Sequence, residues 1–292
     1  MSKFRLRGRR KRTKGEAKRD RIPVRAIIPN MVTSLAACAG ITSISLASEG
    51  RFTSALGALL VACICDGMDG RIARLLKASS KLGAELDSLA DFVNFGVAPA
   101  MFMFFWLTGG PAHTIGGEAV AQQTVRLVLG SALFYALCDC FRLARFNTML
   151  EQPPVPYWKN YFTGVPAPGG CWMVLSPAML AISLDAKGRF PMLAAFLQNP
   201  YFGMAMLLFV GSLMASRIPT ISLKSLHIPK KALRPLMAAI LLAIAFLWVN
   251  TWLTLAVVGI GYIASVPLTA WCFARTRERY LKSNPSGACA SA

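Results

Sequence analysis

The sequence is poor in charged residues, and poorest in acidic ones. Only 15% of its 292 residues are charged, and 13 Asp and Glu stand against 32 Lys and Arg. No long polar stretch interrupts the chain between about residue 26 and about residue 275. This scarcity of polar sequence excludes a large soluble catalytic domain, whose surface would be built mainly from polar and charged side chains.

Histidine is also scarce, and cysteine does not occur in a ligand or disulfide pattern. The chain has two histidines and eight cysteines. Cys63 with Cys65 and Cys138 with Cys140 are CxC pairs inside apolar runs. We therefore interpret the cysteines as small buried residues and expect neither a zinc site nor a disulfide framework.

Long apolar runs are what the sequence does contain, and hydrophobic residues make up 55% of it. The runs approach the roughly 20 residues that a helix needs to cross a bilayer. We expect an all-α integral membrane protein with about eight transmembrane helices. They are predicted over residues 26–48, 52–76, 86–107, 125–147, 165–185, 198–216, 233–250 and 252–274. A seven-helix alternative would merge or lose one span near residues 186–200.

Basic residues lie mainly outside the apolar runs. Residues 1–25 hold 12 Lys or Arg and too few apolar side chains for a core or a cleavable signal peptide. With this tail inside, the external segments contain only Arg51, Arg126, Lys187 and Arg189. The positive-inside rule then predicts that both termini are cytoplasmic. We expect the tail to contact anionic lipid and not nucleic acid, because aromatic residues do not interleave with its basic ones.

Four aspartates fall at or inside the predicted spans, where a carboxylate is costly. They are Asp66, Asp69, Asp87 and Asp91. Each would cost about 2.5 to 3.5 kcal/mol at the centre of a bilayer, so something must compensate them. On helices the first two share one face, and the last two lie one turn apart. The polar segment 75–82 predicts a cytoplasmic turn, and the resulting hairpin brings the four carboxylates together.

Carboxylates in this number and spacing suit a hard divalent cation. Mg²⁺ or Mn²⁺ typically bridges carboxylates and substrate phosphates, so the pattern predicts a two-metal site for phosphoryl transfer. Gly70, Ala73 and Gly83 have almost no side chain, which lets phosphates approach the backbone closely. The alternative is that the aspartates only form ion pairs with neighbouring basic residues, but ion pairs do not require glycines between the carboxylates.

Residues 66–91 match a known signature. They read DGMDGRIARLLKASSKLGAELDSLAD and agree with DxxDGxxARx8GxxxDxxxD at every fixed position. In this the sequence resembles the CDP-alcohol phosphotransferases. The resemblance implies a core of six transmembrane helices within residues 26–225, usually in a homodimer, with a site open to the cytoplasmic leaflet. Residues 226–276 would add a transmembrane hairpin, and residues 277–292 a cytoplasmic tail.

The resemblance also implies a role for each residue of the motif. Asp66, Asp69 and Asp87 would hold one metal ion, while Asp66, Asp87 and Asp91 would reach a second, with Asp91 as the general base. The CDP-linked lipid would be bound by residues of the motif and of the start of the first span, namely Asn30, Thr33, Gly70, Ala73, Arg74, Ser80 and Gly83. The guanidinium of Arg74 suits a diphosphate. The alternative is that the Arg74 side chain only snorkels to the membrane interface. The polar residues of the first span could equally cap or join helices.

Segments outside the motif indicate the acceptor. Residues 87–100, 141–148, 161–170 and 216–224 resemble the bacterial branch that makes phosphatidylserine and CMP from CDP-diacylglycerol and L-serine. That branch implies a multi-pass protein of the bacterial inner membrane. We expect the serine to contact Asn94, Arg142 and Arg145, because an amino-acid carboxylate needs a cation and hydrogen-bond donors. Anchoring by the positive-inside rule would explain the two arginines equally well.

The sequence departs from this branch at Asn94, at the small segment 164–170 and at Asp139. The simplest role for Asp139 is an intrahelical ion pair with Arg142, one turn later. The departures leave open another acceptor, glycerol 3-phosphate or an inositol phosphate. A divalent-cation transporter would be expected to spread its polar groups across the membrane depth, and not to place them on one hairpin. A lipid-binding scaffold would explain the basic tail but not the carboxylates.

Overall fold

The computed structural model describes residues 27–77, 80–110, 114–115, 118–149, 161–185, 190–216, 219–221 and 233–283. Two predicted segments fall outside this part of the chain. They are the basic tail at residues 1–25 and the last residues of the C-terminal tail, 284–292.

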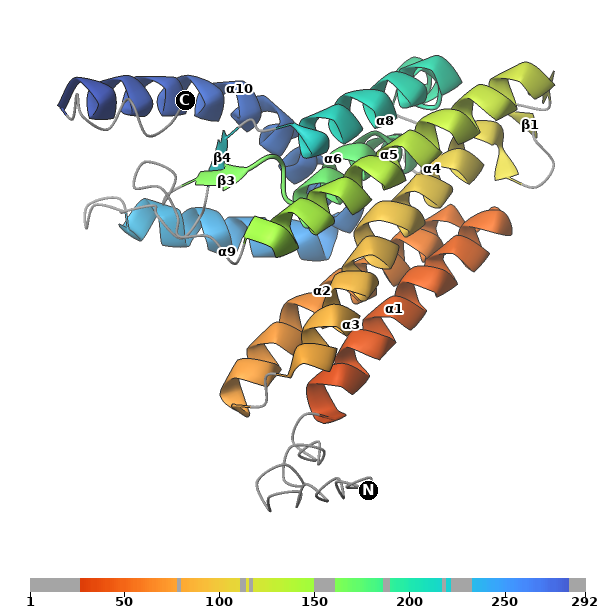
Figure 1. Ribbon diagram of the computed structural model, residues 1–292. Helices are drawn as coiled ribbons and strands as arrows, with labels where there is room; N and C mark the ends of the chain where they lie inside the picture. The colour runs from red at the N-terminus through yellow and green to blue at the C-terminus, as the bar shows by residue number, and fades with distance from the viewer. Residues whose placement is uncertain are drawn as a thin grey trace, which may run out of the picture.

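The first three spans form one side of the molecule (Figure 1). α1 (Ile27–Ser48) packs along the antiparallel α2 (Phe52–Leu75), and Gly50, with φ +78°, makes the turn between them. α3 (Lys81–Asp91) continues through the π-helix η2 (Phe92–Val97) into α4 (Ala98–Thr108), and all three contact α1. The third span is therefore one long helical segment whose middle is π-helical.

The remaining helices pack against this group mainly through α4 and η2. α4 (Ala98–Thr108) contacts α5 (Gln122–Met149), which packs along α8 (Pro200–Ala215). α6 (Ala167–Asp185) packs between α8 and the C-terminal helix. The short α7 (Pro191–Leu197) and α8 together form one apolar segment that bends by 53°.

The C-terminal pair is α9 (Leu233–Val249) and α10 (Thr251–Ser283), and the first part of α10 packs against α6. Two short antiparallel pairings lie in the connections. β1 (Thr114–Ile115) pairs with β2 (Glu118–Ala119), and β3 (Tyr161–Thr163) pairs with β4 (Pro219–Ile221). These short strands pair loop segments with one another and do not change the all-α class of the fold.

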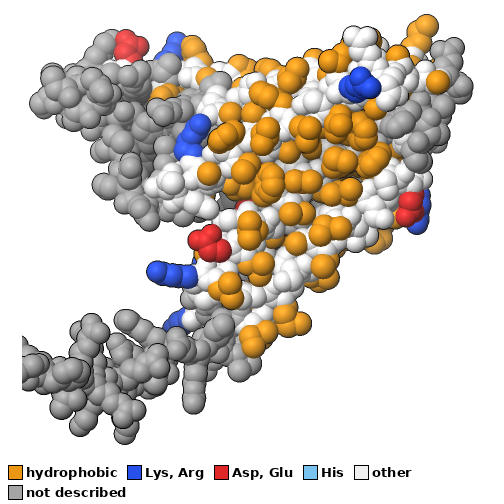
Figure 2. Space-filling view, turned by 45° about the vertical axis from the view of Figure 1, so that its right-hand side comes forward, with side chains coloured by type: hydrophobic (Ala, Val, Ile, Leu, Met, Phe, Trp, Pro, Cys, Tyr) orange, Lys and Arg blue, Asp and Glu red, His pale blue; other side chains and the backbone are white. Residues whose placement is uncertain are grey.

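The prediction of an all-α, multi-pass membrane protein is confirmed. Within the described part of the chain, six helical segments are long and apolar enough to cross a membrane, and the bent α7–α8 pair would make a seventh. The apolar part of α9 is shorter than these spans, so the predicted count of eight stays a prediction. Apolar side chains cover the visible flank of the bundle, and the few charged ones lie near its edges (Figure 2). A belt of this kind matches the hydrocarbon of a bilayer.

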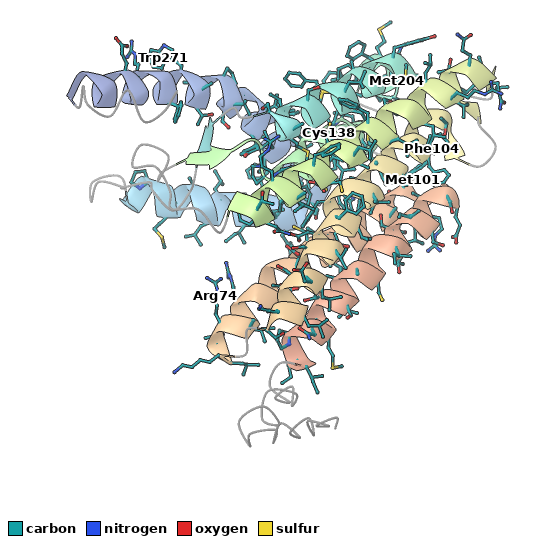
Figure 3. All side chains as sticks on the ribbon, in the orientation of Figure 1. Arg74, Met101, Phe104, Cys138, Met204 and Trp271 are labelled. Carbon is teal, nitrogen blue, oxygen red and sulfur yellow. The ribbon has the colours of Figure 1, made fainter. Side chains whose placement is uncertain are left out.

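The core lies where α4, α5, α6 and α8 cross, and it is made of large apolar side chains (Figure 3). Phe102, Leu107 and Met173 are completely buried there. One polar bond crosses this core: Tyr135 donates its hydroxyl to the carbonyl oxygen of Phe95, 2.9 Å away. The acceptor belongs to η2, where a helix with irregular turns leaves carbonyl groups available to side chains.

Close packing of α10 on α6 predicts a large effect of one methyl group. A Cβ atom at Gly259 would lie 2.8 Å from the carbonyl oxygen of Trp172 and 2.8 Å from Cβ of Ser176. We expect Gly259→Ala to lower the stability by about 1 to 3 kcal/mol, because overpacked backbone must move. Gly261→Ala is the matched control in the same helix, since no described residue lies within 4 Å of its Cβ position. Thermal unfolding in detergent measures both, and equal melting temperatures for the two variants would contradict this packing.

Candidate metal and nucleotide site

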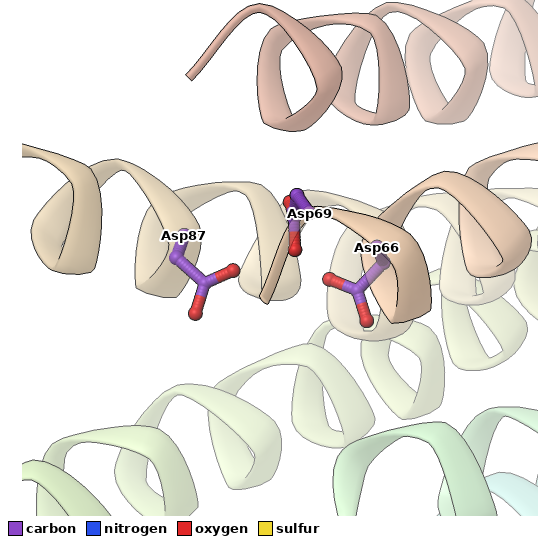
Figure 4. A group of neighbouring side chains, drawn as sticks. All are labelled: Asp66, Asp69 and Asp87. Carbon is purple, nitrogen blue, oxygen red and sulfur yellow. The ribbon is translucent and has the colours of Figure 1, made fainter. Parts of the chain in front are cut away.

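Three carboxylates converge at the α2–α3 hairpin. Asp66 and Asp69 project from α2 and Asp87 from α3, toward a common space (Figure 4). One oxygen from each lies within 4.8 Å of the others. Asp69 is only 3% exposed, and the other two are half-buried. The structure thus brings together three of the four aspartates that the sequence predicts as metal ligands.

The local sequence explains the hairpin that carries these carboxylates. α2 ends at Leu75, and Lys77 adopts a positive φ of 50°, which ends the helical run. Ser80 is the N-cap of α3, and its Oγ accepts a hydrogen bond of 3.0 Å from the backbone N–H of Gly83. α3 therefore begins five residues before the predicted span at residue 86, because a capping serine satisfies its first turn. As a result Gly83 lies on the helix itself.

α1 is tied to this cluster by a buried hydrogen bond. Thr33 donates its hydroxyl to Oδ2 of Asp69 at 2.6 Å, and it also lies 3.1 Å from the carbonyl oxygen of Pro29. The hydroxyl has one proton, and the short distance to a carboxylate favours the bond to Asp69. Thr33 was predicted to line the donor pocket. Its position adds a second function, which is to fix the orientation of one carboxylate.

A cavity of about 180 Å³ opens beside the cluster. It is bounded by the first turns of α1, the last turns of α2 and the first turns of α3, so it lies near the end of the bundle where α1 begins (Figure 1). Every residue predicted to bind the CDP-linked donor lines it. The full set is Pro29, Asn30, Thr33, Asp69, Gly70, Ala73, Arg74, Ser80, Gly83, Ala84 and Asp87.

The two motif glycines have different reasons to be glycine. A Cβ atom at Gly83 would lie 2.8 Å from Oδ1 of Asn30 and 3.1 Å from Oγ of Ser80, so glycine lets α1 and α3 approach each other. Gly70 lines the cavity, and nothing of the described chain lies within 4 Å of its Cβ position. Packing explains the first glycine. The second leaves room for a ligand at the backbone.

Arg74 lies at the outer edge of the cavity. Its side chain is exposed and extends from α2 away from the bundle (Figure 3), and Nε donates a hydrogen bond of 3.1 Å to the carbonyl oxygen of Gly70. This bond leaves the two Nη groups to meet an anion at the mouth of the pocket.

The donor set fits a divalent cation. Three carboxylates offer up to six oxygens within a few ångströms, and oxygen ligands of this charge suit Mg²⁺ and Mn²⁺. Asp91 lies one turn beyond Asp87, outside this group of three, and its carboxyl group is in hydrogen-bonding reach of Asp66. Asp91 is therefore a fourth carboxylate beside the cluster of three, and it interacts with both Asp66 and Asp87.

The residues predicted to bind serine do not meet at one point. Asn94, 1% exposed, lies in η2 with its amide against Gly40 of α1. Arg145 uses Nη1 to donate to the carbonyl oxygen of Ser216 at 3.3 Å, which links α5 to the end of α8. Arg142 lies in electrostatic range of Asp91.

Two residues that line the cavity, Pro29 and Ala84, are not among those predicted from the sequence. Each is adjacent to a predicted residue, and that neighbourhood is the only signal that could have found them. For Asp139 the sequence predicted only an intrahelical ion pair. In the structure this residue is fully buried on α5, in electrostatic range of Asp91.

Comparison with known proteins agrees with this arrangement. The family model described as CDP-alcohol phosphatidyltransferase matches residues 26–210, and a model described as CDP-alcohol phosphatidyltransferase 2 matches residues 232–267. Three similar curated proteins carry the name CDP-diacylglycerol--serine O-phosphatidyltransferase. One from Mycobacterium leprae is 33% identical over 89% of this chain and 78% of its own length. One from Helicobacter pylori strain J99 is 34% identical over 66% of this chain and 70% of its own length. One from Bacillus subtilis is 35% identical over 53% of this chain and 80% of its own length.

The matched region contains the carboxylate cluster, the cavity and all six helices from α1 to α6, so the chain belongs to the CDP-alcohol phosphatidyltransferase family.

Proposed function

We propose that this protein is a membrane enzyme that transfers the phosphatidyl group of CDP-diacylglycerol to the hydroxyl group of L-serine, giving phosphatidylserine and CMP. The observation that carries the proposal is the convergence of three carboxylates beside a cavity lined by every predicted donor-binding residue. The names of relatives that are 33% to 35% identical support serine as the acceptor.

The nucleotide end of the lipid would occupy the cavity. Gly70 and Ala73 allow the diphosphate to lie against the backbone of α2, and the guanidinium of Arg74 would pair with it at the mouth. Divalent cations, Mg²⁺ or Mn²⁺, bound by the aspartates would supply positive charge to the diphosphate and to the departing phosphate of CMP. Thr33 holds Asp69 in place by its hydrogen bond, so this ligand does not have to reorient when the substrate binds.

Asp91 is the residue that would take the proton. Its carboxylate accepts the proton of the serine hydroxyl while the hydroxyl oxygen forms a bond to the phosphorus on the lipid side. The bond between this phosphorus and the bridging oxygen of the diphosphate breaks, and its electron pair leaves with CMP. The transfer is direct, so no phosphatidyl group becomes attached to the enzyme.

The protein would sit in the bacterial inner membrane with its site at the cytoplasmic face. The cavity lies near the start of α1, and in the sequence α1 follows the basic segment that the positive-inside rule assigns to the cytoplasm. Both termini would be cytoplasmic, the basic tail would contact anionic lipid, and the enzyme would work as a homodimer. The experiment that tests the function is release of CMP from CDP-diacylglycerol by the purified protein, measured with and without serine.

The metal assignment predicts different effects of two neighbouring acidic residues. Asp87→Asn should lower the rate more than about 100-fold, because even partners of metal ligands are worth about 10- to 100-fold. Glu85→Gln is the matched control, since Glu85 is exposed on the same helix and outside the cluster. Rates of serine-dependent CMP release are measured across a titration of Mg²⁺ or Mn²⁺. Similar rates for the two variants at ordinary metal concentration would contradict the assignment.

The open space at Gly70 predicts a defect in donor binding without a defect in folding. Gly70→Ala should raise the KM for CDP-diacylglycerol by about tenfold or more, because an added methyl group occupies space that the ligand needs. Gly67→Ala is its control on the same helix, since Gly67 is exposed, does not line the cavity and has nothing of the described chain within 4 Å of its Cβ position. Steady-state kinetics with thermal unfolding separate the two effects. An unchanged KM for Gly70→Ala would place the diphosphate elsewhere.

The role of Asp91 predicts that binding and turnover separate. Asp91→Asn should reduce the rate by about 10² to 10⁴-fold, because a general base is worth that much, while most of the affinity for CDP-diacylglycerol remains. Binding is measured by titration of the lipid and turnover by formation of phosphatidylserine. Direct attack also predicts no exchange of labelled CMP into CDP-diacylglycerol when serine and phosphatidylserine are absent. Exchange under these conditions would indicate a covalent intermediate instead.

A further inference from the structure

One buried carboxylate is not used by the proposed mechanism. Asp139 of α5 is 0% exposed, and neither of its oxygens has a hydrogen-bond partner in the described part of the chain. A buried charge without a partner is strongly destabilising, and the penalty is greater inside a membrane. A side chain of this kind calls for a cation in the working protein.

The cation expected from the sequence does not pair with it. Arg142 lies one turn later on the same helix, yet the described residues contain no ion pair between the two side chains within 4.0 Å. Nε of Arg142 is itself buried and without a hydrogen-bond partner. α5 therefore presents an unpaired anion and an unpaired cation that are close neighbours along one helix face.

The backbone of η2 makes room for this pair beside the candidate base. A Cβ atom at Gly96 would lie 2.8 Å from Oδ2 of Asp139, so glycine at this position admits the carboxylate. Gly96 follows Asp91 by five residues, which is the hydrogen-bonding interval of a π-helix, and the two therefore share a side of the helix. Both Asp139 and Arg142 lie in electrostatic range of Asp91.

We propose that Asp139 binds the ammonium group of the acceptor amino acid while Arg142 binds its carboxylate. A free amino acid carries one positive and one negative group on the same carbon atom, which matches an anion and a cation that do not satisfy each other. The hydroxyl group of the same molecule then lies toward Asp91. The inference rests on the proposed transfer to serine, and it makes Asp139 a determinant of acceptor specificity.

Asn94 is not part of this acceptor site. It belongs to the same π-helix, but its amide lies against Gly40 of α1, whereas Asp139 contacts η2 at Gly96 from α5. Two residues apart in a helix point in nearly opposite directions. The acceptor site therefore lies between η2 and α5, and Asn94 faces α1 instead.

A series of acceptors tests the assignment in the full-length enzyme. L-Serine is compared with 3-hydroxypropionate, which lacks the ammonium group, and with ethanolamine, which lacks the carboxylate. Asp139→Asn should raise the KM for serine by about 10- to 100-fold and bring kcat/KM for serine down toward the value for 3-hydroxypropionate. Arg142→Gln should instead remove the preference for serine over ethanolamine. The KM for CDP-diacylglycerol should stay unchanged in Asp139→Asn.

Thermal unfolding distinguishes a binding role from a structural one. Removing a buried unpaired charge should leave the melting temperature of the serine-free Asp139→Asn protein equal to or above that of wild type, while the increase caused by serine should disappear. Ser183→Ala is the control. Ser183 is also buried, and its hydroxyl has no hydrogen-bond partner in the described part of the chain, but it lies on α6, near the C-terminal end of that helix. It should keep both the serine preference and the serine-induced shift.

Two results would overturn the inference. One is an unchanged ratio of kcat/KM for serine over 3-hydroxypropionate in Asp139→Asn. The other is a fall in melting temperature with parallel changes in KM for both substrates, which would mean that Asp139 only supports the fold or orients Arg142. A wild-type enzyme that does not use serine at all would instead refute the proposed function, so the two failures are distinguishable.

Discussion

A carboxylate inside a membrane protein is stable only where positive charge or hydrogen bonds compensate it, and this requirement organises the end of the bundle where α1 begins. Asp66, Asp69 and Asp87 are brought within 4.8 Å of one another, which is unfavourable without a cation between them. The α2–α3 hairpin imposes this arrangement through a serine-capped helix start, and α1 fixes one carboxylate through Thr33. The fold thus holds three mutually repelling carboxylates together, and a bound divalent cation would relieve that repulsion.

Small residues allow this polar region to exist beside a tightly packed apolar core. Gly83 admits the amide of Asn30, and Gly96 admits the carboxylate of Asp139. Between them the third span changes from α-helix to π-helix, which shifts the direction of the side chains that follow Asp91. Helices in lipid gain stability by close van der Waals packing at small residues, and the same residues here leave space for polar groups.

Donor and acceptor would approach the aspartates from different helices. The cavity for the CDP-linked lipid is formed by α1, α2 and α3, whereas Asp139 and Arg142 belong to α5. Asp91 lies between the two groups, at the start of η2. With this division the α2–α3 hairpin would bind the CDP-linked donor, while the choice of acceptor would depend on α5 and on the room that Gly96 provides.

The sequence by itself determined the all-α membrane architecture, the carboxylate hairpin and most of the lining of the cavity, because hydropathy and helical spacing act locally along the chain. Tertiary structure alone decided which polar side chains meet across helices. Nothing in the spacing of Thr33 and Asp69 indicates their hydrogen bond. The i, i+3 spacing of Asp139 and Arg142 favoured an ion pair that does not form. Such contacts depend on how α1, η2 and α5 are rotated and packed against one another, and that is a property of the whole bundle.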